Sequence, residues 1–415
     1  MTLTGEAGQR GARVRSDCWV GIELRDTGGV SVAVQSKVGA LYGGDIQKLI
    51  GQGLAELGVA HAAVTVEDQG ALPFTLAARL EAAVRRARDD LKDERTILLP
   101  MSKRCVYTTT SARPRRSRLY LPGNEPKFFV NAGLHQPDGI ILDLEDSVAP
   151  AQKDAARILV RNALRAVDFH GCERMVRINQ GEVGLQDLDW IVPHNVHVIL
   201  IPKVEHPRQV DRVQNRIEDI QREHGLKGDI YLMPIIESAK GAWRAFEIAG
   251  AADTVVALAV GLEDYTADIG AERTLEGRES FWARSQVING ARAAGVQPID
   301  TVFSDVTDME GLRASVLEAR SLGFVGKGCI HPRQIAVVHE ALAPTPPQIQ
   351  KAQQIVLAFE EAERQGLGVV ALGSKMIDPP VVKRALHTVA SAEAAGLLAS
   401  DWRQKIADRE QEGAS

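Results

Sequence analysis

After residue 117 the chain repeats one pattern: a short apolar run that ends in polar residues, followed by a segment with helical periodicity. The runs are rich in Val, Ile and Leu at successive positions, which is typical of parallel strands buried on both faces. Parallel strands require crossover connections, and the helical segments between the runs supply them. Eight runs are present, namely RLYLPG, GIILDLEDSV, RMVRIN, VHVILIPKVE, IYLMPIIES, VVALAVGLEDY, QPIDTVF and GFVGKGCIHP. The pattern predicts an α/β fold, a (βα)8 TIM barrel.

Charged residues stand at the carboxyl end of one predicted strand after another. In a βα barrel these ends meet at one mouth, where barrel enzymes carry their chemistry. Buried charge is costly, so a barrel built only for stability would avoid this arrangement. The residues are Asp143, Glu145, Asp146, Arg177, Lys203, Glu237, Asp264, Asp300 and His331. Their positions predict an enzyme.

Glu237 and Asp264 follow successive apolar strands and have no basic neighbour in sequence. Either acid alone is more often a helix cap or a salt-bridge partner, but two carboxylates at adjacent strand ends favour a Mg²⁺ site completed by waters. Arg177 either pairs with an acid across the mouth or offers a fork to a substrate carboxylate. For Lys203 the sequence favours an ion pair at the mouth. His331 is equally compatible with a structural hydrogen bond and a catalytic role.

Residues 1–95 predict a small α+β domain. CWVGIEL and VSVAVQS alternate like the two strands of a hairpin, and a helix from Asp45 ends near Gly58. The strand AAVTVED and a helix from Pro73 complete the domain. No catalytic constellation is present, so this part of the chain is interpreted as a binding or carrier module.

Residues 96–116 predict a basic flexible linker. The stretch from residue 96 to 118 holds 6 Lys/Arg and no Asp/Glu, with no sustained helical period. Its arginines form either a solvated face or a phosphate-binding cluster at the mouth of the next domain. A flexible linker of this length would span roughly 26 Å, about 5–6 Å times the square root of the number of residues. We assign residues 117–340 to the barrel and 341–415 to a C-terminal helical extension.

The overall composition excludes several classes of protein. The formal net charge of -5 provides no broad basic surface for nucleic acid, and no apolar run is long enough for a membrane helix. The first residues lack the apolar core of a secretory signal, so we expect a cytoplasmic location. The cysteines, at 18, 105, 172 and 329, lack metal-site spacing and are expected to be incidental buried thiols.

The motifs RSRLYLPGNEP, ILDLEDSVAP, VRIN, PKVE, PIIES, GLEDYTADIG, GKGCIHPRQI and GSKMIDPP occur in order over about residues 115–395. Together they resemble the citrate lyase beta subunit and its malyl-CoA and citramalyl-CoA lyase relatives, the HpcH/HpaI aldolase family. The resemblance implies a homotrimer or a multiple of it. The residues it marks are Glu237 and Asp264 as Mg²⁺ ligands, Arg177 as the substrate arginine, Glu145 and Asp146 facing the metal waters, and Arg116 and Ser117 near the CoA phosphates.

The same resemblance assigns Asp378 to a C-terminal lid that reaches the neighbouring subunit's site. The alternative is that Asp378 caps the helix that begins near Pro379.

In the first domain the stretches SVAVQSKV, GDIQKLI and VEDQGALPFTLAARLEAAVRRA resemble the acyl carrier (gamma) subunit of citrate lyase. That resemblance implies a triphosphoribosyl-dephospho-CoA arm on Ser16. The alternative is an exposed serine in a ragged terminus.

The two resemblances imply a Mg²⁺-dependent carbon–carbon lyase. Its substrate would be a 3-hydroxy-3-carboxyacyl thioester, citryl, malyl or citramalyl, on CoA or on the carrier arm, and its products a 2-oxo acid and an acetyl thioester. Arg177 would clamp charge on the carbonyl side, and Asp378 would protonate the enolate carbon. Two alternatives stay open: the same chemistry in the condensing direction, as in malate synthase, or an assembly subunit that depends on a separate acyl-transferase subunit.

Overall fold

The computed structural model describes residues 3–88, 95–366, 370–372, 375–406 and 408. It divides into two compact units, Met1–Ile335 and Ala336–Ser415, which are described separately. No helix in the described ranges is both long and apolar enough to cross a membrane. The cysteines at 18, 105, 172 and 329 are all free and buried, as predicted.

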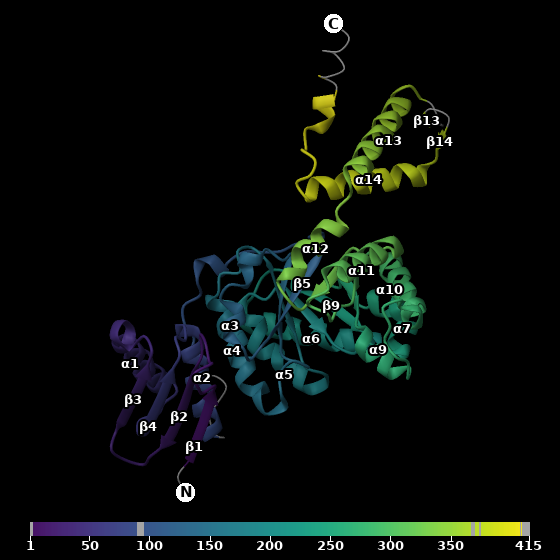
Figure 1. Ribbon diagram of the computed structural model, residues 1–415. Coiled ribbons are helices and arrows are strands. Elements are labelled where there is room, and N and C mark those ends of the chain that lie inside the picture. Colours follow the sequence, from purple (N-terminus) through teal and green to yellow (C-terminus); the bar gives the residue numbers. More distant parts are fainter. Residues whose placement is uncertain (1–2, 89–94, 367–369, 373–374, 407, 409–415) are drawn as a thin grey trace. The chain divides into compact units, whose positions relative to one another are not determined.

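The first unit begins with a four-stranded sheet in the order β1-β2-β4-β3 (Figure 1). The strands are β1 Leu3–Gly8, β2 Cys18–Leu24, β3 Val30–Ser36 and β4 Ala62–Asp68. The predicted hairpin of β2 and β3 is wrong: β2 forms a hairpin with β1, and β4 lies between β2 and β3. The reason is the helix after β3, which crosses over the sheet and returns β4 parallel to β3.

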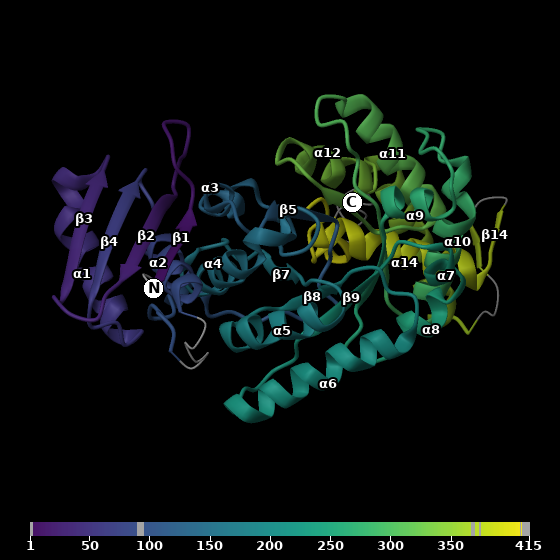
Figure 2. The same ribbon diagram turned by 90° about the horizontal axis from the view of Figure 1, so that it is seen from below.

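Two helices cover one face of this sheet (Figure 2). Helix α1, Gly39–Glu56, begins six residues before the predicted start and ends where Gly58 adopts a φ of 71°. Helix α2, Pro73–Ala87, is buried at nearly every position from Phe74 to Val84, charged residues included. A helix buried all round must pack on two sides, and α2 contacts both the sheet and the barrel helix α4, Lys153–Ala166.

A buried ion pair joins α2 to α4. Both Glu81 and Arg161 are at most 1% exposed, and the Arg161 guanidinium donates to the two Glu81 oxygens at 3.1 and 2.7 Å. Glu81 also accepts from Arg85 and from the Ile97 N–H, and Arg161 lies 5.3 Å from the ring centroid of Trp190. The first domain is therefore fixed on the barrel.

The predicted flexible linker also packs along the barrel. Its arginines find acids that lie far away in the sequence: Arg115 pairs with Glu173 at 2.7 Å, both fully buried, and Arg116 pairs with Asp138 at 2.8 Å. The short 3₁₀ turn η1, Lys103–Cys105, and Tyr107, whose hydroxyl donates to the Cys172 carbonyl, hold the middle of the stretch. The lack of local acids suggested a solvated linker, but these ion pairs are non-local.

Eight parallel strands then close a barrel in the order β10-β11-β12-β5-β6-β7-β8-β9, which confirms the predicted fold (Figure 1). The strands are β5 Ser117–Pro122, β6 Gly139–Asp143, β7 Glu173–Arg177, β8 Val198–Ile201, β9 Tyr231–Ile236, β10 Ala257–Val260, β11 Gln297–Asp300 and β12 Gly326–Cys329. The helices besides α4 are α3 Pro126–Phe129, α5 Gly181–Ile191, α6 Pro207–His224, α7 Ala239–Trp243, α8 Ala245–Ala249, α9 Leu262–Asp268, α10 Phe281–Ala293, α11 Met309–Leu322 and α12 Arg333–Leu342. Further 3₁₀ turns are η2 Ala132–His135, η3 Pro150–Gln152, η4 Val192–His194 and η5 Arg278–Ser280.

Side chains fill the barrel interior in layers. Ile141, Met175, Ile235 and Ile299, from β6, β7, β9 and β11, belong to one buried apolar cluster. Because side chains alternate along a strand, the positions two residues further on also point inward, at the carboxyl ends. Two residues after Ile141, Met175 and Ile235, these inward positions hold Asp143, Arg177 and Glu237, respectively.

The second unit is mainly helical, as predicted for the C-terminal extension. It contains α13 Pro346–Arg364, the strand pair β13 Val370–Leu372 and β14 Lys375–Ile377, and α14 Pro379–Ala394. Ile355, Val356, Val389 and Trp402 belong to its own apolar cluster.

We expect Glu81→Ala to lower the free energy of unfolding by about 3–5 kcal/mol, because it leaves the Arg161 charge buried without a partner. Glu182→Ala is the matched control, since it removes an exposed ion pair with Arg212 and should cost less than about 1 kcal/mol. Urea unfolding measures both. Equal midpoints for the two variants would show that the buried pair does not fix the first domain to the barrel.

Candidate active site

The inward side chains at the carboxyl ends of the strands surround a cavity of about 380 Å³. Asp143, Arg177, Glu237 and Asp264 line its mouth, and Ile235 and Ala259 line it further down. A cavity of this size with apolar walls and a few charged groups is typical of a small-molecule site. The structure therefore brings six of the predicted strand-end residues to one place, these four together with Asp146 and Asp300.

Arg177 and Asp143 form the central interaction of the mouth. Arg177 Nε and Nη2 donate to the two Asp143 oxygens at 2.6 and 2.8 Å, a bidentate geometry. Burial alone would raise the pKa of Asp143, but the hydrogen bonds and the charge of Arg177 outweigh it, so the pKa is lowered. Burial would likewise lower the pKa of Arg177, and Asp143 raises it instead. Both groups stay charged, and Asp143 fixes the orientation of the guanidinium.

The loop after β6 adds two more carboxylates. Arg177 Nη1 lies 3.0 Å from a Glu145 oxygen and 3.3 Å from an Asp146 oxygen. Burial and the adjacent Asp146 raise the pKa of Glu145. Burial also acts to raise the pKa of Asp146, but the hydrogen bond with Glu145 and the cations Arg177 and Lys203 outweigh it and lower that pKa. Of the two carboxylates, Glu145 is therefore the more easily protonated and Asp146 the more firmly ionised.

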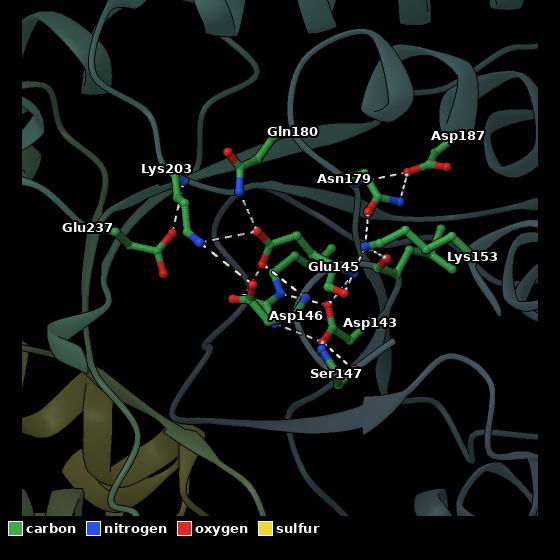
Figure 3. Close-up of polar contacts among 12 residues, drawn as sticks. Asp143, Glu145, Asp146, Ser147, Lys153, Asn179, Gln180, Asp187, Lys203 and Glu237 are labelled. Atoms are coloured by element: carbon green, nitrogen blue, oxygen red, sulfur yellow. Dashed lines mark hydrogen bonds and ion pairs between the residues drawn. The ribbon is translucent and has the colours of Figure 1, made fainter. Parts of the chain in front are cut away.

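Lys203 links these acids to the neighbouring strand ends (Figure 3). Its ammonium lies 3.6 Å from Glu145, 3.6 Å from Asp146 and 3.4 Å from Asp264. Its backbone, at a φ of 50°, donates an N–H to Glu237 Oε2 at 2.9 Å. The ion pairs that the sequence favoured for Lys203 are therefore present.

Glu237 is 7% exposed, and burial raises its pKa to about 7. The charge of Asp264 raises that pKa further, so the two carboxylates interact. A Cβ at Gly261 would lie 2.4 Å from Glu237 Oε1, and glycine is therefore required for Glu237 to reach this position. Since the ionised form is costly without a cation beside it, Glu237 fits a metal ligand.

Nowhere in the described ranges do three Asp, Glu, His or Cys side chains converge in a way that would hold a metal ion. The predicted Glu237 and Asp264 site is thus a pair of hard oxygen donors at an open cavity. Such a pair suits Mg²⁺, which usually keeps several waters and takes one or two carboxylates from the protein.

A further shell holds the β6 loop in place (Figure 3). Lys153 donates to the Leu144 and Glu145 carbonyls at 3.0 Å each and to the side chain of Asn179. Asn179 in turn donates twice to Asp187 at 2.8 Å. The carboxylates at the mouth are therefore held on a rigid support.

Comparison with known proteins decides the family. A model described as HpcH/HpaI aldolase/citrate lyase matches residues 116–332, more than half of the chain. The citrate lyase subunit beta of Leuconostoc mesenteroides subsp. cremoris is 39% identical over 292 residues, 70% of this chain and 97% of that protein. The chain belongs to the HpcH/HpaI aldolase/citrate lyase family. It is a carbon–carbon lyase.

Other relatives carry different names within this family. The mitochondrial citramalyl-CoA lyase of Homo sapiens is 34% identical, covering 67% of this chain and 86% of that protein. A crystal structure of CitE from Mycobacterium tuberculosis in complex with magnesium, acetoacetate and coenzyme A is 31% identical, with a TM-score of 0.56 over 69% of this chain and 100% of that chain.

Further family models match both ends of the chain. A model described as C-C bond lyase of the TIM-barrel fold matches residues 279–397. A model described as acyl carrier protein, malonate decarboxylase delta subunit, matches residues 6–87. The first domain of this lyase is thus an acyl-carrier-like domain, as the resemblance implied.

The structure does not bring every predicted residue of this lyase to the cavity. Arg116 and Ser117 lie at the amino end of β5, where Arg116 is paired with Asp138 and Ser117 is fully buried. Parallel strands place amino ends and carboxyl ends at opposite ends of the barrel, so these two residues cannot contact a ligand at the mouth.

Asp300 lines the cavity, but its carboxylate is engaged by other side chains, and His331 is engaged in packing. The Asp300 carboxylate pairs with Lys327 and with Arg284 of α10. His331 accepts an N–H from Arg333 at the start of α12, which favours its structural role.

Asp378 belongs to the second unit. It occupies the N-cap position of α14, but its side chain makes no capping hydrogen bond, so the capping alternative is not realised by the carboxylate. Ser16 lies in the loop between β1 and β2 at a φ of 53°, and is therefore part of an ordered turn.

Sequence reasoning missed Tyr120 and Gly261 and placed Arg118 only among the arginines of the basic stretch, although all three line the cavity. Arg118 and Tyr120 stand two residues apart in an otherwise apolar strand, so the alternation of side chains points both into the barrel. That spacing was the available signal. Nothing in the sequence marks Gly261, because its role depends on the distant Glu237.

We expect Arg177→Lys to reduce lyase activity roughly 100-fold with the fold retained, since one ammonium cannot hold Asp143 bidentately and also reach Glu145. Arg216→Lys, at an exposed pair with Asp189, is the control and should leave activity unchanged. Steady-state kcat/KM and thermal midpoints of both variants check this. Activity within a few-fold of the original would restrict Arg177 to a structural ion pair.

Proposed function

We propose that the protein is a Mg²⁺-dependent lyase that cleaves a 3-hydroxy-3-carboxyacyl thioester to a 2-oxo acid and an acetyl thioester. The observation that supports it most directly is the convergence of a fixed arginine, Arg177, with the carboxylate pair Glu237 and Asp264 on one cavity. The relatives agree with this proposal, since they include a citrate lyase subunit, a citramalyl-CoA lyase and a complex with magnesium and coenzyme A.

Glu237 and Asp264 would hold the metal, which when bound supplies Lewis-acid polarisation of the substrate's hydroxyl and carboxylate oxygens. Their neighbours support that task. Lys203 keeps Glu237 oriented through its backbone N–H, and Gly261 leaves the space that the Glu237 carboxylate occupies.

Arg177 would bind the negative charge on the fragment that becomes the 2-oxo acid. Asp143 already fixes its plane, so the guanidinium needs little reorganisation when substrate binds. In cleavage the carbinol hydroxyl gives its proton to a carboxylate at the mouth, the bond to the thioester α-carbon breaks, and the electron pair of that bond passes to the thioester enolate. A proton delivered to that carbon completes the acetyl group.

The metal assignment predicts that Glu237→Gln and Asp264→Asn each weaken Mg²⁺ binding more than about tenfold and abolish cleavage. Calorimetric titration with Mg²⁺ measures the first effect and chromatography of the products the second. Asp189→Asn, at an exposed ion pair, is the control. Unchanged Mg²⁺ affinity in both variants would contradict the assignment.

For the proton donor we propose Asp378 of a neighbouring subunit, in a homotrimer or a multiple of it. What supports this is that the Asp378 carboxylate is exposed and makes no capping bond, although it stands at an N-cap. Such a group is available to a site elsewhere.

Mixing an Asp378→Asn chain with a Glu237→Gln chain should then restore part of the activity that each lacks alone. After exchange, some sites combine an intact metal pair with an intact acid from the adjacent subunit. Mass spectrometry of the mixed oligomers verifies exchange. Exchanged oligomers as inactive as their parents would argue against a shared site.

We further propose that Ser16 carries a phosphodiester-linked CoA-type arm. Asp17, the next residue, pairs with Arg79 at 2.9 Å, and Arg79 donates to the Asn124 carbonyl at 2.8 Å in the loop after β5. The serine loop thus lies against the carboxyl end of the barrel, which suits an arm that enters the cavity.

Intact mass of the natively purified protein should show an excess on the peptide containing Ser16, and Ser16→Ala should lack it while still cleaving free CoA thioesters. An unmodified native serine would leave free CoA thioesters as the substrate. If the protein cleaves no CoA thioester until a separate acyl-transferase loads the acyl group, the assembly-subunit alternative is favoured instead.

A further inference from the structure

Arg118 lies in the interior of the barrel, below the carboxylates of the mouth. It is 1% exposed, and together with Tyr120 it lines the cavity. Its neighbours in the strand register are Gly139 of β6 and Gly328 of β12. Glycine on both flanking strands leaves room inside the barrel for this long side chain.

The charge of Arg118 is not neutralised by the protein. Its guanidinium contacts Met233 Sδ at 3.1 Å and the Asp300 carbonyl at 3.4 Å, and its Nε has no partner. The first is a weak acceptor and the second contact is long. No carboxylate in the described ranges forms an ion pair with Arg118.

The nearest acid is already engaged. The Asp300 carboxylate binds Lys327 Nζ at 2.7 Å and Arg284 at 3.3 Å, and Arg284 in turn pairs with Glu318. These two acids and two cations neutralise one another, so no acid of this group is left to neutralise Arg118. An arginine cannot lose its proton to escape the cost of burial, so a buried, unpaired guanidinium at a cavity indicates an anionic ligand.

We propose that Arg118, assisted by the hydroxyl of Tyr120, binds a second carboxylate of the substrate. The inference rests on the proposed function, in which one carboxylate and the hydroxyl are held at the mouth. The remaining substituent of the carbinol carbon then extends towards the cavity floor. A substituent that carries a carboxylate meets Arg118, whereas a methyl group or hydrogen leaves it unpaired. Arg118 therefore selects substrates whose released 2-oxo acid is a dicarboxylate.

The test compares two thioesters that differ only in this substituent, citryl-CoA with a carboxymethyl group and citramalyl-CoA with a methyl group. The unaltered protein should prefer citryl-CoA by at least roughly 100-fold in kcat/KM. Arg118→Met keeps the length of the side chain and removes the charge. It should lower kcat/KM for citryl-CoA roughly 100-fold and change that for citramalyl-CoA less than about threefold.

Two further variants sharpen the result. Arg118→Lys keeps the charge without the fork and should lose part of the preference, and it tests the subsite even if Arg118→Met fails to fold. Arg292→Met removes an exposed arginine of α10 and should leave both substrates unaffected. The thermal midpoint of Arg118→Met should be equal to or above that of the unaltered protein, because an unpaired buried charge is removed.

Direct binding separates this inference from the proposed function. Calorimetry in the presence of Mg²⁺ should show that oxaloacetate binds more tightly than pyruvate and that Arg118→Met removes the difference. A protein that cleaves neither thioester but retains this binding difference would overturn the lyase proposal and support the subsite. Equal losses on both thioesters in Arg118→Met, or an intact preference in that variant, would overturn the subsite.

Discussion

Closure of eight parallel strands is the constraint on which the site depends. A closed parallel barrel has a single carboxyl end, and the last inward position of each strand must point towards its axis. Asp143, Arg177 and Glu237 occupy such positions, each two residues beyond a buried apolar neighbour. Charges that are scattered along the sequence are thereby brought within hydrogen-bond distance, and the bidentate Asp143–Arg177 pair sets the orientation for the rest.

Much of this was predictable because it depends on local sequence. The barrel strands are short apolar runs, and their polar ends mark the mouth without any knowledge of long-range contacts. Pairing between distant segments was not predictable in the same way. β3 alternates like a hairpin strand, yet it pairs in parallel with β4 because the helix between them carries the chain back along the sheet. The acids that neutralise Arg115 and Arg116 follow them by more than twenty residues, so the stretch read as a solvated linker.

Two errors at the site have physical causes of a different kind. Arg116 adjoins a strand that contributes to the cavity, but its position before that strand places it at the wrong end of the barrel. Arg118 was grouped with the arginines of the basic stretch, as part of a solvated face or a phosphate-binding cluster, because it directly follows them in sequence. Only the interior packing shows that it is buried without a partner, between two flanking glycines.

The fixed attachment of the first domain determines how many carrier-like domains are present for each barrel. When the carrier and the lyase are separate polypeptides, their ratio depends on two expression levels, and an excess of one is left without a partner. Here one polypeptide contains both parts, so each barrel has one carrier-like domain at every concentration, and Glu81 and Arg161 fix that domain on the barrel. The ratio of the two domains is then set by the reading frame and is unaffected by dilution.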